Sequence, residues 1–534
     1  MTVCVGNVSA VFSVTVVTAR DGALTGLIGN RTKNRSICVC FKALVQYLHF
    51  FCRKAVKLLM PDCSLTITNW GMLGMNVLMI MLDSLRRDHV GCYGNDWIRT
   101  PNIDKFSKEC VVFTRAFPEG LPTIPVRRAM HTGFRTYPNT GYVPRKGDDV
   151  KVPGWEPMPD KQVTISEIFK HGGYTTALYC STYHMFKPSM SFHRGFDCWE
   201  WIRGHENDRY RTPLKDDVEN LKNLPCELAY GVVGHGLEHN LANIQEWRTE
   251  EDWFPARTFG AAIRWLEGNR EAEDFFLVVD EFDPHEPWCA PKPMLDLYFD
   301  TADYNGRRII NTRGGAFPFR EGELRYTRAQ YAGEVTLVDK YVGKLLDKVR
   351  ESGLLENTLV FILSDHGHPI MDHGVLHKVP PGCLYPELMD LVYMIYHPDK
   401  EYAGTTCDAY VSTHDVAATV LALAGVSSPV KMEGRNIWEW VTDGKTDRRE
   451  YMTSIYGGYV WCRDEEHAYI SNSDGKEVRL YDVQEDPKQL NDIAEEKTEV
   501  SGRMYQHVLE DAGGALPHFQ MRRLGLPWYD SAWI

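Results

Sequence analysis

Apolar runs alternate with amphipathic segments along most of this chain, from residue 76 onward. The run NVLMIML at Asn76–Leu82 is apolar after its first residue, which is typical of a strand buried on both faces. Similar runs occur at Thr175–Cys180, at residues 275–279 and at Thr358–Ser364. Several segments between them carry apolar residues at helical spacing. This alternation predicts a large, mostly parallel central sheet with helices on both faces.

Local capping signals indicate where several of these helices begin. Thr164 and Glu167 form a Thr-x-x-Glu capping box, in which the two side chains satisfy the first free N–H groups of a helix. Thr100 and Pro101 place an N-cap and a first-turn proline ahead of another helix. A third helix is predicted to open at Pro125.

The pattern changes near both ends of the chain and divides it into three parts. Residues 1–71 show no clean period of 2 or 3.6, and we interpret them as a poorly defined N-terminal extension. Residues 72–432 carry the alternating pattern and form the predicted large α/β domain. Residues 433–534 form a smaller C-terminal α+β subdomain with an antiparallel sheet, because two strands flank a Ser-Asp-Gly turn at residues 473–475.

Composition excludes some classes of function. The chain has 534 residues, of which 43% are hydrophobic and 25% charged, the mix of a folded globular protein. Its formal net charge of −13 gives no general attraction for nucleic acid or for an anionic membrane. No apolar stretch reaches the roughly 20 residues that a membrane-spanning helix needs. We therefore expect no nucleic-acid partner and no integral membrane span, and a homo-oligomer is left open.

The cysteines and the start of the chain bear on the compartment. Nine of the 14 cysteines lie scattered after residue 70, without the spacing of a metal site, as expected for free thiols in a reducing compartment. The start of the chain is apolar but lacks the basic region of a signal peptide. We expect a cytoplasmic protein, with a secreted or periplasmic location left open.

Polar residues stand directly after three of the apolar runs. They are Asp83, the segment at residues 280–285, and Asp365 with His366. The carboxyl ends of parallel strands meet at one edge of a sheet, where ligands bind. A single Asp at such a place more often caps the following helix. Three such places together favour a site where carboxylate oxygen and imidazole nitrogen bind one divalent cation.

A fourth candidate element is the loop before the helix predicted at Pro125. Thr123 precedes this helix, whose N-terminus presents unpaired N–H groups and a positive dipole end. Arg127 lies one turn into the helix, where its guanidinium can reach the same anion. Beside a metal, the Thr123 hydroxyl is equipped to attack a tetrahedral phosphorus or sulfur centre. The alternative is that Thr123 is an ordinary N-cap.

An opening segment and five further motifs, in order, resemble those of the sulfatase family within the alkaline phosphatase superfamily. The opening of the family is resembled by NVLMIMLDSLRRDHVGCYGN followed by TPNIDKFSKECVVFTRAF in this chain. The family's catalytic signature is resembled by Thr123-x-Pro125-x-Arg127 with Thr132 and Gly133. Further matches are DPHEPW at 283–288, SDHG at 364–367, DHG at 372–374 ahead of Lys378, and RLYDVQEDPKQLNDIA at 479–494. The resemblance covers most of residues 76–494 and implies the sulfatase fold.

The resemblance also implies one metal site and one set of catalytic side chains. The implied ligands of a single divalent metal are Asp83, Asp365, His366 and the nucleophile, Thr123. In addition to Thr123, the resemblance implies catalytic residues that hold the nucleophile, the leaving group and the non-bridging oxygens. These residues are Arg127, His285, Lys378 and, by a weaker match, His184. Developing negative charge needs such cations, and preorganised charge is usually the largest catalytic contribution.

The chain departs from the family pattern at three positions. Thr123 stands where sulfatases carry a Cys or Ser that is oxidised to formylglycine, and the methyl group on its Cβ excludes that aldehyde. Ser84 stands where the family usually has a second Asp, which favours Mn²⁺ or Zn²⁺ over Ca²⁺ or Mg²⁺. CSTYH at residues 180–184 replaces the usual Gly-Lys-Trp-His, so the family's first active-site lysine is missing.

Together these observations predict a metal-dependent hydrolase that cleaves a small anionic ester through an unmodified Thr123. We favour a phosphate monoester, a phosphodiester or a phosphonate, because superfamily members use an unmodified threonine on phosphorus. The first alternative is a sulfuric ester hydrolase of the arylsulfatase kind. The second is a catalytically silent binding protein that keeps the fold, motivated by the lost Cys, Asp and Lys.

Overall fold

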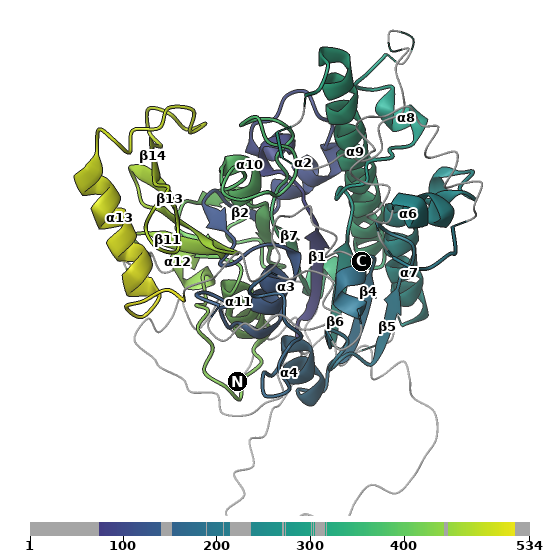
Figure 1. The fold of residues 1–534 in the computed structure, drawn as a ribbon. Helices are drawn as coiled ribbons and strands as arrows, with labels where there is room; N and C mark the ends of the chain where they lie inside the picture. The colour runs from purple at the N-terminus through teal and green to yellow at the C-terminus, as the bar shows by residue number, and fades with distance from the viewer. Residues whose placement is uncertain are drawn as a thin grey trace, which may run out of the picture. The chain divides into compact units, whose positions relative to one another are not determined.

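The computed structural model describes residues 74–139, 152–187, 190–206, 208–213, 237–269, 274–300, 318–442 and 447–517, with a few single residues between these ranges (Figure 1). The chain divides into residues 1–72 and residues 73–534, and the described residues all belong to the second part. The predicted N-terminal extension lies outside the described residues. The boundary predicted between residues 432 and 433 stays a prediction.

An eight-stranded sheet lies at the centre of the second part, with the strand order β5-β4-β6-β1-β7-β8-β2-β9. Its strands are β1 (Asn76–Leu82), β2 (Val111–Phe113), β4 (Thr175–Cys180), β5 (Cys198–Trp201), β6 (Phe275–Glu281), β7 (Thr358–Ser364), β8 (Tyr393–Tyr396) and β9 (Thr405–Cys407). Among these strands only β8 runs antiparallel to its neighbours. The predicted mostly parallel sheet is confirmed, and β6 extends two residues beyond the apolar run.

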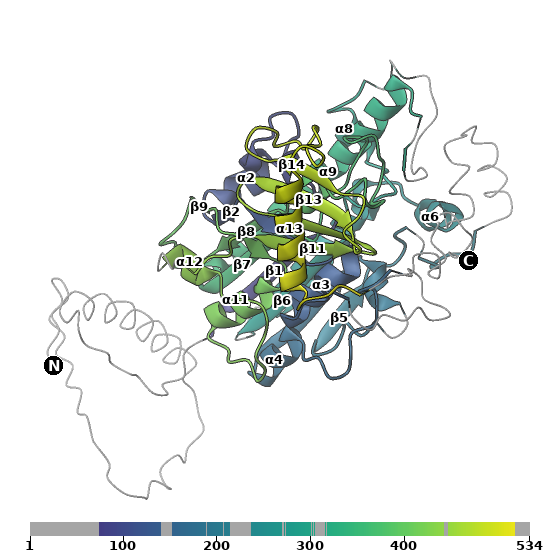
Figure 2. The same cartoon turned by 60° about the vertical axis from the view of Figure 1, so that its left-hand side comes forward.

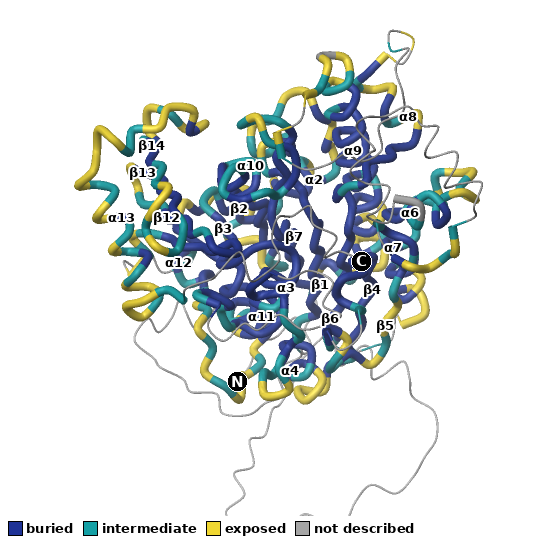
Figure 3. Tube along the Cα trace, in the orientation of Figure 1, coloured by how far each residue is buried: buried dark blue, intermediate teal, exposed yellow. Residues whose placement is uncertain are grey.

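Alternate residues of β1 face opposite helical layers. Val77, Met79 and Met81 pack in the core that includes residues of α3 (Thr123–Thr132), α4 (Ile165–His171) and α11 (Asp415–Ala424). Leu78, Ile80 and Leu82 pack in the core that includes residues of α2 (Pro101–Ser107), α7 (Phe254–Gly268) and α9 (Glu321–Glu351). Every residue of β1 is therefore buried, and the tube through the central sheet is dark blue in Figure 3. Helices cover both faces, as predicted.

The capping signals have different outcomes in the structure. At α4 the predicted box is present, since Thr164 Oγ1 accepts a hydrogen bond from the Glu167 N–H and Glu167 Oε2 accepts one from the Thr164 N–H. At α2 Thr100 is the N-cap residue and Pro101 the first helical residue, as predicted, but the Thr100 side chain makes no capping hydrogen bond. Asp339 of α9 takes its place and accepts hydrogen bonds from the N–H groups of Asn102 and Ile103.

A second sheet, antiparallel throughout, lies in the C-terminal part of the chain. Its strands, in spatial order, are β11 (Met452–Tyr456), β12 (Tyr459–Arg463), β13 (His467–Asn472) and β14 (Arg479–Asp482). α13 (Thr498–Asp511) lies across this sheet in Figure 2 and packs on it through Met504 and Val508. The predicted antiparallel subdomain is confirmed, and its predicted hairpin is β13 and β14.

This C-terminal sheet supports two loops at the carboxyl edge of the central sheet. The Leu121 N–H donates to the Ile455 carbonyl oxygen at 2.9 Å, just before α3. The Tyr456 hydroxyl donates to the Lys378 carbonyl oxygen at 2.8 Å. Both loops carry residues for which the sequence predicted catalytic roles.

Shorter elements complete the fold. They are β3 (Ala116–Phe117), β10 (Val411–Ser412), α6 (Leu237–Ile244), α8 (Lys292–Leu295), α10 (Pro386–Met389), α12 (Trp438–Thr442) and the 3-10 turns at Arg87–His89, Gly91–Tyr93, Tyr183–Phe186, Glu250–Asp252 and Leu354–Asn357. None of the helices within the described ranges combines the length and apolar character that crossing a membrane requires.

Candidate active site

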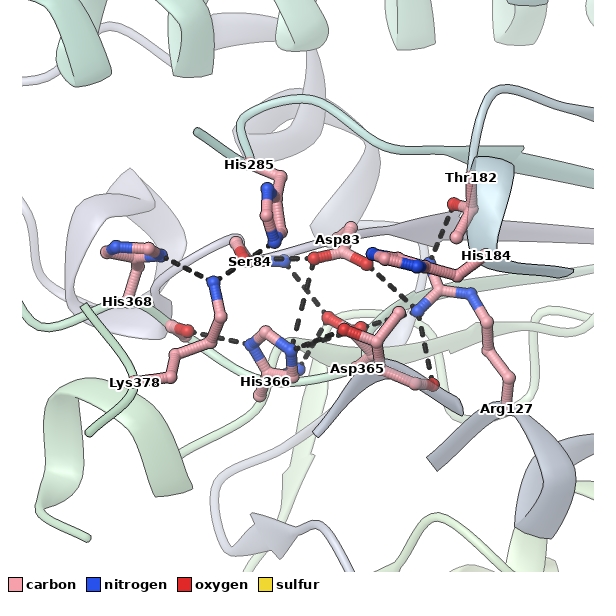
Figure 4. Close-up of polar contacts among 12 residues, drawn as sticks. Asp83, Ser84, Arg127, Thr182, His184, His285, Asp365, His366, His368 and Lys378 are labelled. Atoms are coloured by element: carbon pink, nitrogen blue, oxygen red, sulfur yellow. Dashed lines mark hydrogen bonds and ion pairs between the residues drawn. The ribbon is translucent and has the colours of Figure 1, made fainter. Parts of the chain in front are cut away.

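The carboxyl ends of β1, β6 and β7 lie side by side. Leu82 is paired with Ser364 in the sheet, so Asp83 and Asp365 follow two adjacent strands at the same level. One ligand atom from each of Asp83, Asp365 and His366 lies within 4.8 Å of the other two. All three side chains are fully buried. The structure thus brings together the residues that the sequence predicted as protein ligands of a metal (Figure 4).

Thr123 lies opposite His366. Thr123 Oγ1 is 3.3 Å from His366 Nε2, and Thr123 is 2% exposed. His366 Nδ1 is 2.8 Å from the carbonyl oxygen of Gly367, so Nδ1 carries the proton and Nε2 offers its lone pair. Burial lowers the pKa of His366 to about 4. A neutral imidazole therefore presents an acceptor nitrogen to the Thr123 hydroxyl.

The start of α3 differs from the prediction. The helix begins at Thr123 rather than at Pro125, and the residue before it, Pro122, makes no capping bond. Thr123 is therefore not the N-cap. Its hydroxyl faces His366 instead of the first turn. Its φ of 22° is rare for a β-branched residue and costs on the order of 1–3 kcal/mol. Strain of this kind gathers at functional sites.

Arg127 is fully buried among three carboxylates. Its Nη1 lies 2.9 Å from Asp83 Oδ2 and 2.5 Å from Asp365 Oδ2. Its Nε and Nη2 donate to the two oxygens of Asp280 at 2.9 and 2.8 Å, and Nη2 also donates to Thr182 Oγ1 at 3.1 Å. Arg127 thus orients the carboxylates, and the substrate contact that the resemblance implied for it stays a prediction.

The charge of this centre suits a divalent cation. Asp83, Asp280 and Asp365 face one guanidinium, so three ionised carboxylates leave two negative charges unbalanced. Burial and the neighbouring Asp365 raise the pKa of Asp83 well above its usual value. Burial opposes ionisation of Asp365 as well, but His366 and Arg127 hold its pKa at about 2.

The donor atoms also fit such a cation. Asp83 Oδ2 is buried and accepts no hydrogen bond, although the Arg127 guanidinium lies beside it. Ser84, at the position of the family's usual second Asp, donates its hydroxyl to Asp83 Oδ1 at 2.9 Å and its N–H to Asp365 Oδ1 at 3.0 Å. Two carboxylates held in this way and a neutral imidazole are ligands that divalent transition metals accept together.

A second polar cluster adjoins the first. Lys378 Nζ is 3.1 Å from His285 Nε2, 2.9 Å from Glu286 Oε2 and 3.2 Å from His368 Nδ1. Burial lowers the pKa of His285 well below its usual value. Burial would raise the pKa of Glu286, but His285 and Lys378 together lower it. In Figure 4 the Asp83, Asp365 and His366 group lies between Lys378 on one side and Arg127 on the other.

His184 reaches the site from the turn after β4. Its Nε2 lies 3.3 Å from Glu206 Oε2, and its ring packs against Tyr183 and Phe282. Figure 4 shows it beside Asp83 and Arg127. All the site residues predicted from the sequence therefore gather at one edge of the sheet.

Some residues of the site were missed in the sequence. They act on the predicted residues or adjoin them, and they are Thr182, Glu206, Glu286, His368 and His377. Asp280 was noticed only as part of a polar strand end. Its partner Arg127 lies 153 residues away, so no local pattern connects the two.

Comparisons of the whole chain with known proteins find matches among sulfatases. The family model described as Sulfatase matches residues 75–426, and the model described as N-sulphoglucosamine sulphohydrolase, C-terminal, matches residues 372–511. An arylsulfatase of Clostridium perfringens is 25% identical over 449 residues, covering 78% of this chain and 90% of the relative. The multifunctional alkaline phosphatase superfamily protein PehA of Trinickia caryophylli is 24% identical, covering 69% and 77%.

The fold is also similar to solved structures. The crystal structure of the phosphonate monoester hydrolase of Agrobacterium radiobacter has a TM-score of 0.64 at 19% identity. That similarity covers 82% of this chain and 95% of the other. It supports the shared architecture of the central sheet and its helices.

Proposed function

Since the Sulfatase model matches more than half of the chain, the chain belongs to the sulfatase family, and we propose that it cleaves its ester through an unmodified Thr123. Membership makes it an ester hydrolase of the alkaline phosphatase superfamily. The proposal concerns the nucleophile and the substrate, for which we favour a phosphate ester or a phosphonate.

The contact between Thr123 and His366 carries the proposal. The hydroxyl lies 3.3 Å from the neutral imidazole nitrogen of His366. The neighbouring carboxylates of Asp83 and Asp365 share a single guanidinium, so their negative charge is only partly balanced. It also lies at the first residue of α3, where free N–H groups favour an anionic substrate. A buried, strained hydroxyl in such surroundings has the features of an activated nucleophile.

Asp83, Asp365 and His366 would hold the divalent cation, together with the Thr123 oxygen. Bound there, the cation would act as a Lewis acid toward the ester oxygens and lower the pKa of the hydroxyl. Ser84 fixes the orientation of Asp83, and the Gly367 carbonyl oxygen fixes the tautomer of His366. The protein residues thus preorganise the site before a substrate arrives.

The reaction proceeds in two displacements. In the first, the Thr123 oxygen, after losing its proton to water, bonds to the phosphorus as the bond to the leaving oxygen breaks. Lys378, whose ammonium lies 3.1 Å from His285 Nε2, supplies the proton that the leaving oxygen takes up, and it regains a proton from water in the second displacement. In the second, a water oxygen attacks the phosphorus, phosphate or phosphonate leaves, and the Thr123 oxygen regains a proton.

Phosphorus suits this nucleophile better than sulfur. A formylglycine hydrate has a second hydroxyl, so it can expel sulfate by forming an aldehyde again. Threonine has no second hydroxyl, and its ester must be cleaved by attack on the central atom. The relative from Agrobacterium radiobacter is a phosphonate monoester hydrolase, which supports the same preference. The arylsulfatase of Clostridium perfringens favours a sulfuric ester as the second candidate.

Substitution of Thr123 tests the nucleophile. Thr123→Ser keeps the hydroxyl and should retain measurable turnover of an aryl phosphate, an aryl phosphodiester or an aryl phosphonate with Mn²⁺ or Zn²⁺. Thr123→Val keeps the volume but removes the attacking oxygen, so kcat should fall by about a thousandfold or more. Acid quenching and peptide mass analysis should find a phosphoryl group on the Thr123 peptide of the wild type.

Other outcomes separate the alternatives. A sulfo group on that peptide after incubation with an aryl sulfate would indicate the sulfuric ester hydrolase. Turnover near the wild-type rate by Thr123→Val would contradict the proposal and leave water as the nucleophile. A metal-loaded wild type that turns over none of these esters would support the silent binding protein.

A further inference from the structure

A second set of side chains with metal-binding donors lies beside the active site. One ligand atom from each of Glu286, His368 and His377 lies within 4.8 Å of the other two, and these residues share no member with the Asp83, Asp365 and His366 group. His368 is fully buried and His377 is 8% exposed. Glu286 follows β6, whereas the two histidines lie in the loop after β7.

The separations between the donors match those around a zinc ion. Zinc bonds of about 2.0–2.1 Å at tetrahedral angles hold two ligand atoms about 3.3 Å apart. His368 Nε2 lies 2.9 Å from His377 Nδ1, and His377 Nδ1 lies 3.6 Å from Glu286 Oε1. These two distances lie on either side of the expected value and differ from it by a few tenths of an ångström, and the closeness of the three donors, all within 4.8 Å of one another, leaves room for one ion between them.

Lys378 contacts the other edges of the same side chains. Its ammonium lies 2.9 Å from Glu286 Oε2 and 3.2 Å from His368 Nδ1. The contacts with His377 use Glu286 Oε1 and His368 Nε2 instead. His368 Nδ1 also lies 3.2 Å from Glu286 Oε2. One oxygen and one nitrogen are therefore directed away from Lys378.

We propose that Glu286, His368 and His377 bind a second divalent cation, with Zn²⁺ as the best match to two imidazoles and a carboxylate. Its role is structural. His368 and His377 lie near the ends of a loop that Ile370 and Leu376 also join by a β-bridge, and Lys378 follows directly. The ion fastens this loop to Glu286 and so positions Lys378 against His285.

Zinc stoichiometry tests the proposal without reference to activity. The full chain is stripped with a chelator, titrated with zinc chloride, desalted and measured for bound zinc. The wild type should hold two ions per chain. Asp365→Asn should hold one, because only the site near Thr123 is lost. His377→Asn should also hold one, and asparagine tolerates the φ of 62° at this position.

A matched control lies in the same loop. His373 stacks on Tyr385 and belongs to neither donor set, so His373→Asn should keep both ions. Glu286→Gln preserves the side-chain volume and should keep one ion.

Three outcomes would overturn the second site. In the first, the wild type holds a single ion, which is lost in Asp365→Asn and kept in His377→Asn. In the second, His377→Asn and Glu286→Gln both retain two ions. In the third, these two variants both lose the two ions. The first of them leaves the proposed function untouched.

Discussion

Asp280 shows how one residue outside the predicted ligand set can tune the whole site. Its two oxygens bind Nε and Nη2 of Arg127 and leave Nη1 for Asp83 and Asp365. The guanidinium charge is therefore shared among three carboxylates. The surplus of negative charge that favours a cation therefore depends on Asp280, although Asp280 is not one of the predicted metal ligands.

We predict that Asp280→Asn weakens cation binding. The neutral amide removes one negative charge and one of the contacts that orient Arg127, and changes in such supporting residues typically cost 10–100-fold in metal affinity, as an order of magnitude. The affinity for Mn²⁺ should fall by about that factor, measured by calorimetric titration. Asp197→Asn, which removes a carboxylate paired with Lys170 at the surface, is the control. An unchanged affinity in Asp280→Asn would show that charge balance does not govern the site.

Among the secondary-structure elements, α4 and α2 show two ways of starting a helix. α4 is capped by its own sequence through Thr164 and Glu167. α2 is capped by Asp339, which lies in α9. Because Asp339 belongs to another helix, this cap depends on the packing of α2 against α9, and burial there raises the pKa of Asp339 to about 6.

We predict that Thr164→Ala lowers the free energy of unfolding by about 1 kcal/mol, the usual cost of losing an N-cap. Urea unfolding followed by circular dichroism measures the change. Thr498 offers a matched control, since it is the exposed first residue of α13 and does not cap that helix. Thr498→Ala should leave the stability within a few tenths of a kcal/mol. Equal losses in the two variants would argue against the box as the source of stability.

Across the whole molecule, one buried ion pair connects the helical layer to the segment that leads into the C-terminal sheet. Asp415, at the start of α11, accepts hydrogen bonds from both terminal nitrogens of Arg449 at 2.7 Å, and Arg449 lies shortly before β11. The Ser412 and Arg435 N–H groups also donate to Asp415. Burial opposes its ionisation, but Arg449 and His414 hold its pKa at about 2.

This ion pair predicts a pH dependence of stability. Because the pKa of Asp415 is lower in the folded chain than in the unfolded one, its contribution is present above about pH 4 and is lost as the pH falls toward 2. Asp415→Asn should lower the free energy of unfolding by about 3–5 kcal/mol at pH 7 and flatten the decline of Tm below pH 4. Asp399→Asn, at an exposed aspartate, is the control. An equally steep acid decline in Asp415→Asn would contradict this assignment.

The sequence by itself determined the parts that depend on neighbouring residues. The apolar runs gave the observed bounds of β1, β4 and β7, because strands buried on both faces need uninterrupted apolar residues. The capping box of α4 needed only Thr164 and Glu167. The polar residues after β1 and β7 pointed to one edge of the sheet, since parallel strands end there together.

Only the tertiary structure decided which distant groups meet. Asp339, rather than the Thr100 side chain, accepts the hydrogen bonds that cap α2, and the Thr123 hydroxyl faces His366, which lies 243 residues away. The pairing of Arg127 with Asp280 and the meeting of Glu286 with His368 and His377 arise in the same way. Contacts of this kind depend on strand order and on the direction of each buried side chain. Neither the strand order nor the direction of a buried side chain can be predicted from local hydrogen bonding or apolar periodicity.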